Sequence, residues 1–221
     1  MRVADNLLML ALAGPKDSWS AQLEYALTAG CLMDLASEGR IEADETGGLQ
    51  VLNPTPTGRP PHDLVLGRIA EIDSERLPST WVSRLAPETS TALLVDACAR
   101  GVVTERTRRI LGIWPRPEYD VTDQARIVEL REEMLRVYKG SSTDPLATAL
   151  FGLCAAAGLP KLMPGRLRQK ALRRRAQQLP PSAVSDGLGH AAAALAVPLF
   201  TDTGAFMSVG LGDFGGGGDG S

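Results

Sequence analysis

Residues 19–51 decide the fold, and they have the sequence WSAQLEYALTAGCLMDLASEGRIEADETGGLQV. In the first half of this stretch, Leu23, Leu27, Cys31 and Leu35 recur every four residues. Because an α-helix completes a turn in 3.6 residues, this spacing puts the four side chains on one side of a helix. We therefore predict a helix packed into a hydrophobic core.

Both ends of this predicted helix carry local signals. Ser18 or Ser20 can cap its start, because a hydroxyl oxygen accepts a hydrogen bond from a first-turn N–H group. Gly39 is expected to end it. Apolar residues then alternate on either side of a glycine-containing turn at 45–48, which predicts a two-strand hairpin over 41–51.

The overall composition is that of a globular protein with a helical core. Of the 221 residues, 44% are hydrophobic and only 5% are aromatic, so the core must consist mainly of Leu, Ala, Val and Ile. A chain of this length can bury one substantial core. The net charge of −3 argues against a general nucleic-acid binder, which needs a basic surface to displace counterions from phosphates.

The cysteines and histidines show no metal-binding or catalytic spacing. Cys31, Cys98 and Cys154 are odd in number, far apart and set in apolar helical patterns. We interpret them as buried, reduced side chains. His62 and His190 are isolated in the sequence. We predict no metal site, no cofactor and no catalytic triad.

The carboxylates offer no acid–base pair either. Asp34 and Glu38 fit the outer face of the first predicted helix, and the adjacent Glu132 and Glu133 point to different sides of a later one. We predict that the protein is not an enzyme.

The apolar run at 7–13 has some features of a signal peptide. It is very short, however, and Asp5 precedes it where positive charge is expected. We predict an amino-terminal core segment instead. No other run approaches the roughly 20 apolar residues that span a bilayer, so we expect a cytoplasmic protein.

Further helices follow from apolar periodicity and helix-start residues. Asp63 is predicted to cap a helix that runs to about Glu75, and residues 78–80 to open a short helix. Pro87 is predicted to start a separate one that ends at Gly101.

The second half of the chain continues the helical pattern. Thr122 or Asp123 can cap a helix that ends near Lys139. Asp144, followed by a proline, is predicted to cap a nearly all-apolar helix that ends at about Ala157. A helix that is apolar all round is usually central in its domain.

Three other stretches complete the prediction. Residues 110–121 form a second hairpin candidate with short strands. The basic run at 166–175 is most often a solvated helix face, but it can also meet an anionic partner. Residues 204–221 are rich in glycine and are predicted to be a disordered tail. The expected fold over 1–203 is a mostly α helical bundle around a central apolar helix, with small β-hairpins.

The order of several segments resembles the Golgi phosphoprotein 3 family, in a short bacterial-type form, over about residues 3–200. These segments are 7–12, Trp19, 30–36, 38–41, 101–104, 114–119 and 144–159. The most specific match is the pattern Leu-Ala-x-x-Gly-Arg-Ile at 35–41. The resemblance implies a mostly helical bundle with a protruding hairpin and gives no precedent for catalysis.

The resemblance also implies a lipid site. Eukaryotic members bind phosphatidylinositol 4-phosphate on Golgi membranes and gather glycosyltransferases, and a tryptophan before the first core helix belongs to their lipid site. Trp19 matches that tryptophan, which can also be a packing residue at the helix start. The family's phosphate-binding arginines are replaced here by Thr28, Pro87 and Ser90, with Arg84 one turn away.

We therefore predict a lipid-binding site that consists of Trp19, Lys16 and Arg84. The partner is an anionic lipid headgroup, with phosphatidylinositol 4-phosphate as the family's example, on the inner face of a membrane. The resemblance gives the hairpin at 110–121 a role in membrane contact or self-association, through Ile113, Trp114 and Arg116.

Two alternatives stay open from the residues. A helix followed by the hairpin at 41–51 resembles a winged-helix element, so a DNA-binding regulator is conceivable, although the net charge counts against nucleic acid. The second alternative is a protein scaffold that binds neither lipid nor DNA.

Overall fold

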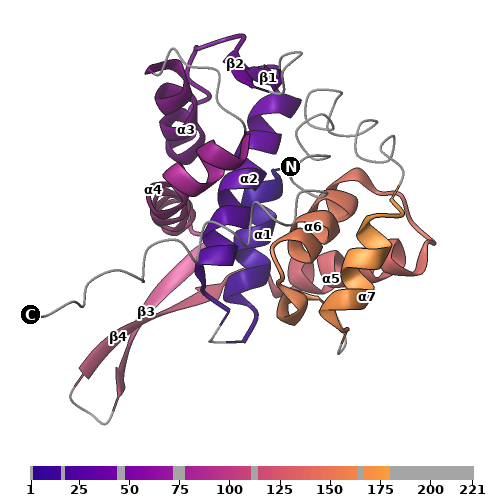
Figure 1. Cartoon of the computed structure of the whole chain (residues 1–221). Coiled ribbons are helices and arrows are strands. Elements are labelled where there is room, and N and C mark those ends of the chain that lie inside the picture. The colour runs from indigo at the N-terminus through magenta and orange to yellow at the C-terminus, as the bar shows by residue number, and fades with distance from the viewer. Residues whose placement is uncertain are drawn as a thin grey trace, which may run out of the picture.

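The computed structural model describes residues 2–15, 18–43, 48–71, 78–110, 114–163 and 167–179. Within these ranges the fold is mostly helical, as predicted, with two separate two-stranded antiparallel sheets (Figure 1). The helices are α1 (Val3–Leu12), α2 (Ala21–Ser37), α3 (Pro60–Glu71), α4 (Pro78–Ala99), α5 (Gln124–Lys139), α6 (Pro145–Ala156) and α7 (Gln169–Ala176), with a 3-10 turn at Pro160–Leu162. The strands are β1 (Ile41–Ala43) paired with β2 (Leu49–Val51), and β3 (Val103–Ile110) paired with β4 (Trp114–Val121).

Helix α2 is the central element, as its sequence predicts. Every residue from 26 to 36 is buried, because α2 packs against α1, α3, α4 and α6. Ser20 is the capping residue, and its hydroxyl oxygen accepts a hydrogen bond from the N–H of Leu23 at 3.3 Å. At the other end Gly39 has a φ of 65°. This backbone conformation allows the N–H groups of Gly39 and Arg40 to donate hydrogen bonds to carbonyl oxygens of the last turn of α2.

The other elements surround α1 and α2 (Figure 1). Helices α3 and α4 lie on one side, and α5, α6 and α7 lie on the other. The β1–β2 hairpin is at one end of α2. The connection between α1 and α2 and the long β3–β4 hairpin are both at the opposite end.

Helix α4 corrects the prediction of two separate helices. It continues from Pro78 to Ala99 with Pro87 inside it. A proline within a helix removes one hydrogen bond and costs about 3 kcal/mol. The buried side chains of Trp81 before it and of Leu93 and Ala97 after it offset this cost by packing into the same core.

The start of α3 is also different from the prediction. The helix begins at Pro60, so Asp63 lies in its first turn and is not the cap. The Asp63 carboxylate instead accepts hydrogen bonds from the N–H and hydroxyl of Thr57, at 2.5 and 2.7 Å, and fixes the preceding loop. The predicted end of this helix at Glu75 lies outside the described residues.

The second hairpin is longer than predicted. Each of its strands has eight residues, and the register pairs Val103 with Val121 and Ile110 with Trp114. Its strands were underestimated because residues 104–107 are exposed, so β3 lacks the apolar alternation that marks a half-buried strand.

The predicted starts of α5 and α6 are confirmed. The carboxylate of Asp123 accepts a hydrogen bond from the N–H of Arg126 at 2.9 Å, and that of Asp144 accepts one from Ala147 at 2.8 Å. The α6 helix is buried over residues 147–156, in agreement with its all-apolar sequence.

The three cysteines are free, and Cys31 and Cys154 are buried as predicted. The prediction that Cys98 is buried is wrong, because this side chain near the end of α4 is partly exposed. Burial raises the pKa of the Cys154 thiol to about 12. None of the described helices is long and apolar enough to cross a membrane. His190 and the predicted tail at 204–221 lie outside the described residues.

Candidate functional site

Trp19 stands just before α2, in the connection that follows α1. Its side chain is 41% exposed, and the indole N–H donates a hydrogen bond to the Glu24 carboxylate at 3.0 Å. Trp81, by contrast, is fully buried in α4. The hydrogen bond fixes one edge of the Trp19 ring while part of the ring meets solvent. An amphipathic ring held in this way suits an interface between water and an apolar phase.

The connection that carries Trp19 is anchored from two sides. The guanidinium of Arg131, on α5, donates a hydrogen bond to the carbonyl oxygen of Ala13 at 3.0 Å. Gly14 is packed so closely that a Cβ on it would stand 3.1 Å from a methyl carbon of Leu162 and 3.2 Å from the Ser18 hydroxyl oxygen. Arg131 therefore belongs to this end of the molecule. Sequence reasoning missed it, because it lies within the charged pattern of α5.

Of the two predicted phosphate contacts, the structure describes only Arg84. Arg84 is exposed on α4 and makes no hydrogen bond or ion pair with another described residue. Thr28 and Ser90 are buried, and each hydroxyl donates to a carbonyl of its own helix, on Glu24 and Pro87 respectively. These two positions therefore cannot contact a ligand at the surface. Lys16 lies outside the described residues.

The β3–β4 hairpin projects from the same end of the molecule as the Trp19 connection (Figure 1). Trp114 and Arg116 are in β4, in register with Ile110 and Arg108. Their side chains lie outside the described part of the structure, as does the whole of Ile113, so their predicted contact role stays a prediction.

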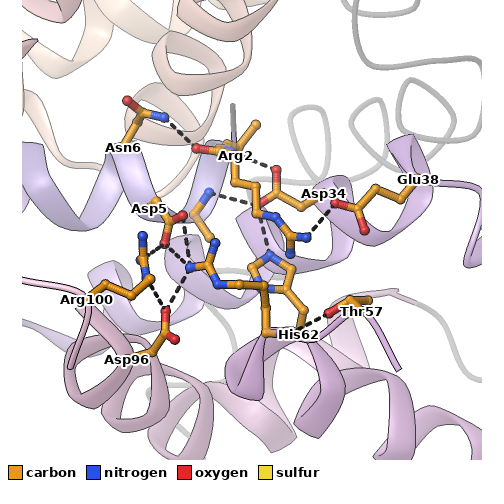
Figure 2. Close-up of polar contacts among 12 residues, drawn as sticks. Arg2, Asp5, Asn6, Asp34, Glu38, Thr57, His62, Asp96 and Arg100 are labelled. Carbon is orange, nitrogen blue, oxygen red and sulfur yellow. Dashed lines mark hydrogen bonds and ion pairs between the residues drawn. The ribbon is translucent and has the colours of Figure 1, made fainter. Parts of the chain in front are cut away.

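A second group of polar residues lies where α1, α2, α3 and α4 meet (Figure 2). The carboxylate of Asp34, on α2, accepts hydrogen bonds from the N–H groups of Val3 and Ala4 at 2.7 and 3.1 Å. Its second oxygen is also 3.1 Å from Nε2 of His62, on α3. Asp34 thus caps α1 from a neighbouring helix. The prediction that Asp34 lies on an outer face is wrong, since both Asp34 and His62 are buried.

Next to Asp34, two arginines and two aspartates form a continuous ionic network (Figure 2). Arg59 contacts Asp5 at 3.0 Å and Asp96 at 2.7 Å, and Arg100 contacts the same two carboxylates at 2.9 and 2.8 Å. Burial alone would raise the pKa of Asp96, but the hydrogen bonds from both arginines outweigh it and lower that pKa. Burial likewise opposes the charge of Arg59, but its contacts with Asp96 and Asp5 raise its pKa.

This network holds helices together and shows no features of a reaction centre. Its charges are paired, and no group of acidic, histidine or cysteine side chains among the described residues could hold a metal ion. Burial, followed by the charges of Asp34 and Asp5, raises the pKa of the adjacent Cys31 thiol well above its usual value. Such a thiol is a poor nucleophile, because the reactive form is the thiolate.

Comparison with known families agrees with this fold. The family model for Golgi phosphoprotein 3 (GPP34) matches residues 3–197. The chain belongs to the Golgi phosphoprotein 3 family. The match runs from the first residue of α1 past the end of α7, so Trp19, the hairpin and the ionic network are all parts of the Golgi phosphoprotein 3 domain. A search of curated proteins finds none that matches the chain.

Proposed function

We propose that this member of the Golgi phosphoprotein 3 family is a non-enzymatic, peripheral membrane-binding module. Its membrane-facing end consists of the Trp19 connection and the β3–β4 hairpin, and its place is the inner face of a membrane. The observation that carries the proposal is the exposed Trp19 ring, anchored through Glu24 at the end from which the hairpin projects. An aromatic ring and a nearby basic surface are the usual elements of peripheral membrane binding.

The basic residues available at the surface favour an anionic lipid. Arg84 on α4 has no partner among the described residues. Arg106 on β3 pairs with Asp120 at 3.1 Å, but its side chain is 72% exposed. Each Lys or Arg close to an anionic membrane contributes about 1 kcal/mol to binding. A few such residues, together with one inserted indole ring, suffice for reversible attachment.

The headgroup preference that we propose follows from the absence of the family's phosphate-binding arginines. Thr28 and Ser90 stand where the family resemblance expects phosphate-binding arginines, and both are buried. Selection of phosphatidylinositol 4-phosphate would require a fixed set of arginines around its phosphate. We therefore propose binding to anionic lipids by charge, with little preference for phosphatidylinositol 4-phosphate over another acidic lipid.

Co-sedimentation with lipid vesicles tests this function. Vesicles of phosphatidylcholine alone, of phosphatidylcholine with phosphatidylglycerol, and of phosphatidylcholine with phosphatidylinositol 4-phosphate are compared at equal charge. We expect binding to both anionic types, and Trp19→Ala to weaken it about tenfold, which corresponds to ~1.4 kcal/mol.

The matched control for this experiment is Leu52→Ala. Leu52 follows β2 and is 51% exposed, so it presents a similar apolar surface at the opposite end of the molecule. We expect Leu52→Ala to bind vesicles as the unaltered protein does. Equal effects of the two substitutions, or no binding to any vesicle by folded protein, would reject the proposal.

The structure argues against the DNA-binding alternative. A winged-helix protein inserts an exposed recognition helix into the major groove. The helix before the β1–β2 hairpin is α2, whose residues 26–36 are all buried. It therefore has no face to offer to DNA. If the folded protein binds no vesicle, the experiment would favour the other alternative, a protein scaffold without lipid binding.

A further inference from the structure

The two outer edges of the β3–β4 hairpin differ in their backbone donors. At the base of the hairpin, the N–H of Thr122 donates to the carbonyl oxygen of Val102 at 3.0 Å. In an antiparallel ladder, hydrogen-bonded pairs alternate with pairs that are not hydrogen-bonded. By the observed register, the even-numbered residues 104–110 therefore bond across to 114–120. The odd-numbered residues of both strands direct their backbone N–H and carbonyl groups outward.

Prolines occupy two of the outward positions on β4. Pro115 and Pro117 have no N–H, so this edge cannot donate to an additional strand at either position. On β3 the outward positions include Glu105 and Thr107, which both have N–H groups. In the described part of the chain, neither residue makes a backbone hydrogen bond outside the ladder. The β4 edge is thus blocked to strand addition, and the β3 edge is open.

The open edge is exposed and basic. Residues 104–107 are exposed, and β3 contains three arginines and one glutamate, a net charge of +2. Two copies of β3 placed side by side would bring like charges together, which is unfavourable. An extended segment with acidic side chains has the opposite charge.

From these observations we propose that the outer edge of β3 binds an extended, acidic peptide segment of a partner protein. The segment adds to the hairpin as a third strand. Its backbone pairs with the outward groups of Glu105 and Thr107. Its carboxylates face Arg106, whose exposed guanidinium also pairs with the Asp120 carboxylate of β4 at 3.1 Å. The edge belongs to the hairpin that the proposed function places at the membrane-facing end, but the peptide proposal does not depend on membrane binding.

Fluorescence polarisation with a labelled peptide of alternating valine and glutamate tests the proposal, with a valine–lysine peptide as the comparison. The decisive variant is Thr107→Pro. Thr107 is in register with Pro117, where no ladder hydrogen bond is formed, so proline blocks the edge and leaves the hairpin paired. The matched control is Thr107→Val, which keeps the N–H group.

We expect the full-length protein to bind the acidic peptide and not the basic one. Thr107→Pro should bind it about tenfold more weakly, because a strand docked there loses a backbone hydrogen bond and clashes with the ring. Thr107→Val should bind within about twofold of the unaltered protein. Peptides that are N-methylated along one edge of the added strand give the same test on the unaltered protein. Methylation of the peptide amides that face β3 should abolish binding, whereas methylation of the amides on the peptide's other edge should not.

Several results would overturn the proposal. The first is acidic-peptide binding that is equal in the unaltered protein and a folded Thr107→Pro variant, or unchanged by N-methylation on either edge. The second is no binding of the acidic peptide. If Thr107→Pro instead abolishes a dimer seen by sedimentation velocity, with no peptide bound, the occupant of the edge is a second copy of this chain. If it abolishes only vesicle binding, the edge is a membrane contact.

Discussion

The two ends of α1 are built in opposite ways. At its start, two N–H groups bind the buried Asp34 carboxylate, and Asp5 joins the network of Arg59, Asp96 and Arg100 (Figure 2). At its end, the chain enters the connection that exposes Trp19 to solvent. The first end has its carboxylates paired with arginines or helix N–H groups inside the protein, and the second leaves a large apolar ring partly exposed. The difference suggests that one end of the bundle provides stability and the other is free to provide contacts.

This division has a physical reason. A buried charge is tolerated only when it is paired and hydrogen-bonded, so residues of the network cannot be changed without a large loss of stability. An exposed amphipathic ring contributes little to folding and is free to make contacts at the surface. Substitutions at the two ends should therefore affect different measurements, and the following predictions test this in order of decreasing effect on stability.

The largest effect is expected for Asp34→Ala. The substitution leaves two N–H groups of α1 and the ring of His62 buried without their partner. We expect the free energy of unfolding to fall by about 3–5 kcal/mol, measured by urea denaturation followed by circular dichroism.

Glu38→Ala is the control for Asp34→Ala on the same helix. Glu38 pairs with Arg2 at 2.9 Å in a more exposed position, so its loss should cost less than about 1 kcal/mol. If the two substitutions cost the same, the start of α1 is not fixed by Asp34.

Arg59→Met should have the second-largest effect. Methionine keeps most of the apolar stem but leaves Asp5 and Asp96 with Arg100 as their only shared cation in the network. We expect a loss of about 2–3 kcal/mol in urea denaturation. The control is Arg68→Met, because Arg68 is exposed beside Glu71 and Glu88 and its loss should leave stability nearly unchanged.

The network also predicts a dependence of stability on pH. The hydrogen bonds from Arg59 and Arg100 lower the pKa of Asp96 despite its burial, so the folded protein keeps this carboxylate charged at a pH where the unfolded chain is protonated. The contribution of the charged Asp96 to stability is complete above the pKa of about 4 that it has in the unfolded chain. It is lost as the pH falls through the lower pKa that Asp96 has in the folded protein.

Urea denaturation at pH values from 7 down to 3 measures this contribution. Between pH 5 and pH 3, the free energy of unfolding of the Asp96→Asn variant should fall by about 1 kcal/mol less than that of the unaltered protein. Parallel curves for the two proteins would show that Asp96 does not titrate differently in the folded state.

Trp19→Ala should have the smallest effect on stability. Its exposed ring and single hydrogen bond to Glu24 predict a change below about 1 kcal/mol. Trp81→Ala removes a fully buried ring and should cost about 3–5 kcal/mol. A loss of similar size for both tryptophans would mean that Trp19 is a packing residue, and the comparison of the two ends would fail.

Local signals predicted the elements that depend on local interactions. The spacing of Leu23, Leu27 and Leu35 predicted α2, and Ser20 and Asp144 predicted the starts of α2 and α6. In each case the residues that decide the structure lie in one helix or at its cap, so the sequence alone contains the necessary information.

Features that depend on distant contacts were not predictable. Asp34 has the charge of a surface residue, and its partners Val3 and His62 are 31 and 28 residues away. Pro87 obeys a strong local rule for ending a helix, which the packing of α4 overrides. The exposure of Trp19, compared with the burial of Trp81, follows from the packed fold and not from either residue's neighbours.

The contacts of α1 have a consequence for the order in which the protein is made. Asp5 meets Arg59 and Arg100 across 54 and 95 residues, and Ala13 meets Arg131 across 118 residues. Helix α1 leaves the ribosome long before α5, so it cannot complete its contacts until α5 has been synthesised. Until then its apolar surface is a substrate for chaperones, and its amides should be among the last to gain protection in pulse-labelled hydrogen exchange during refolding.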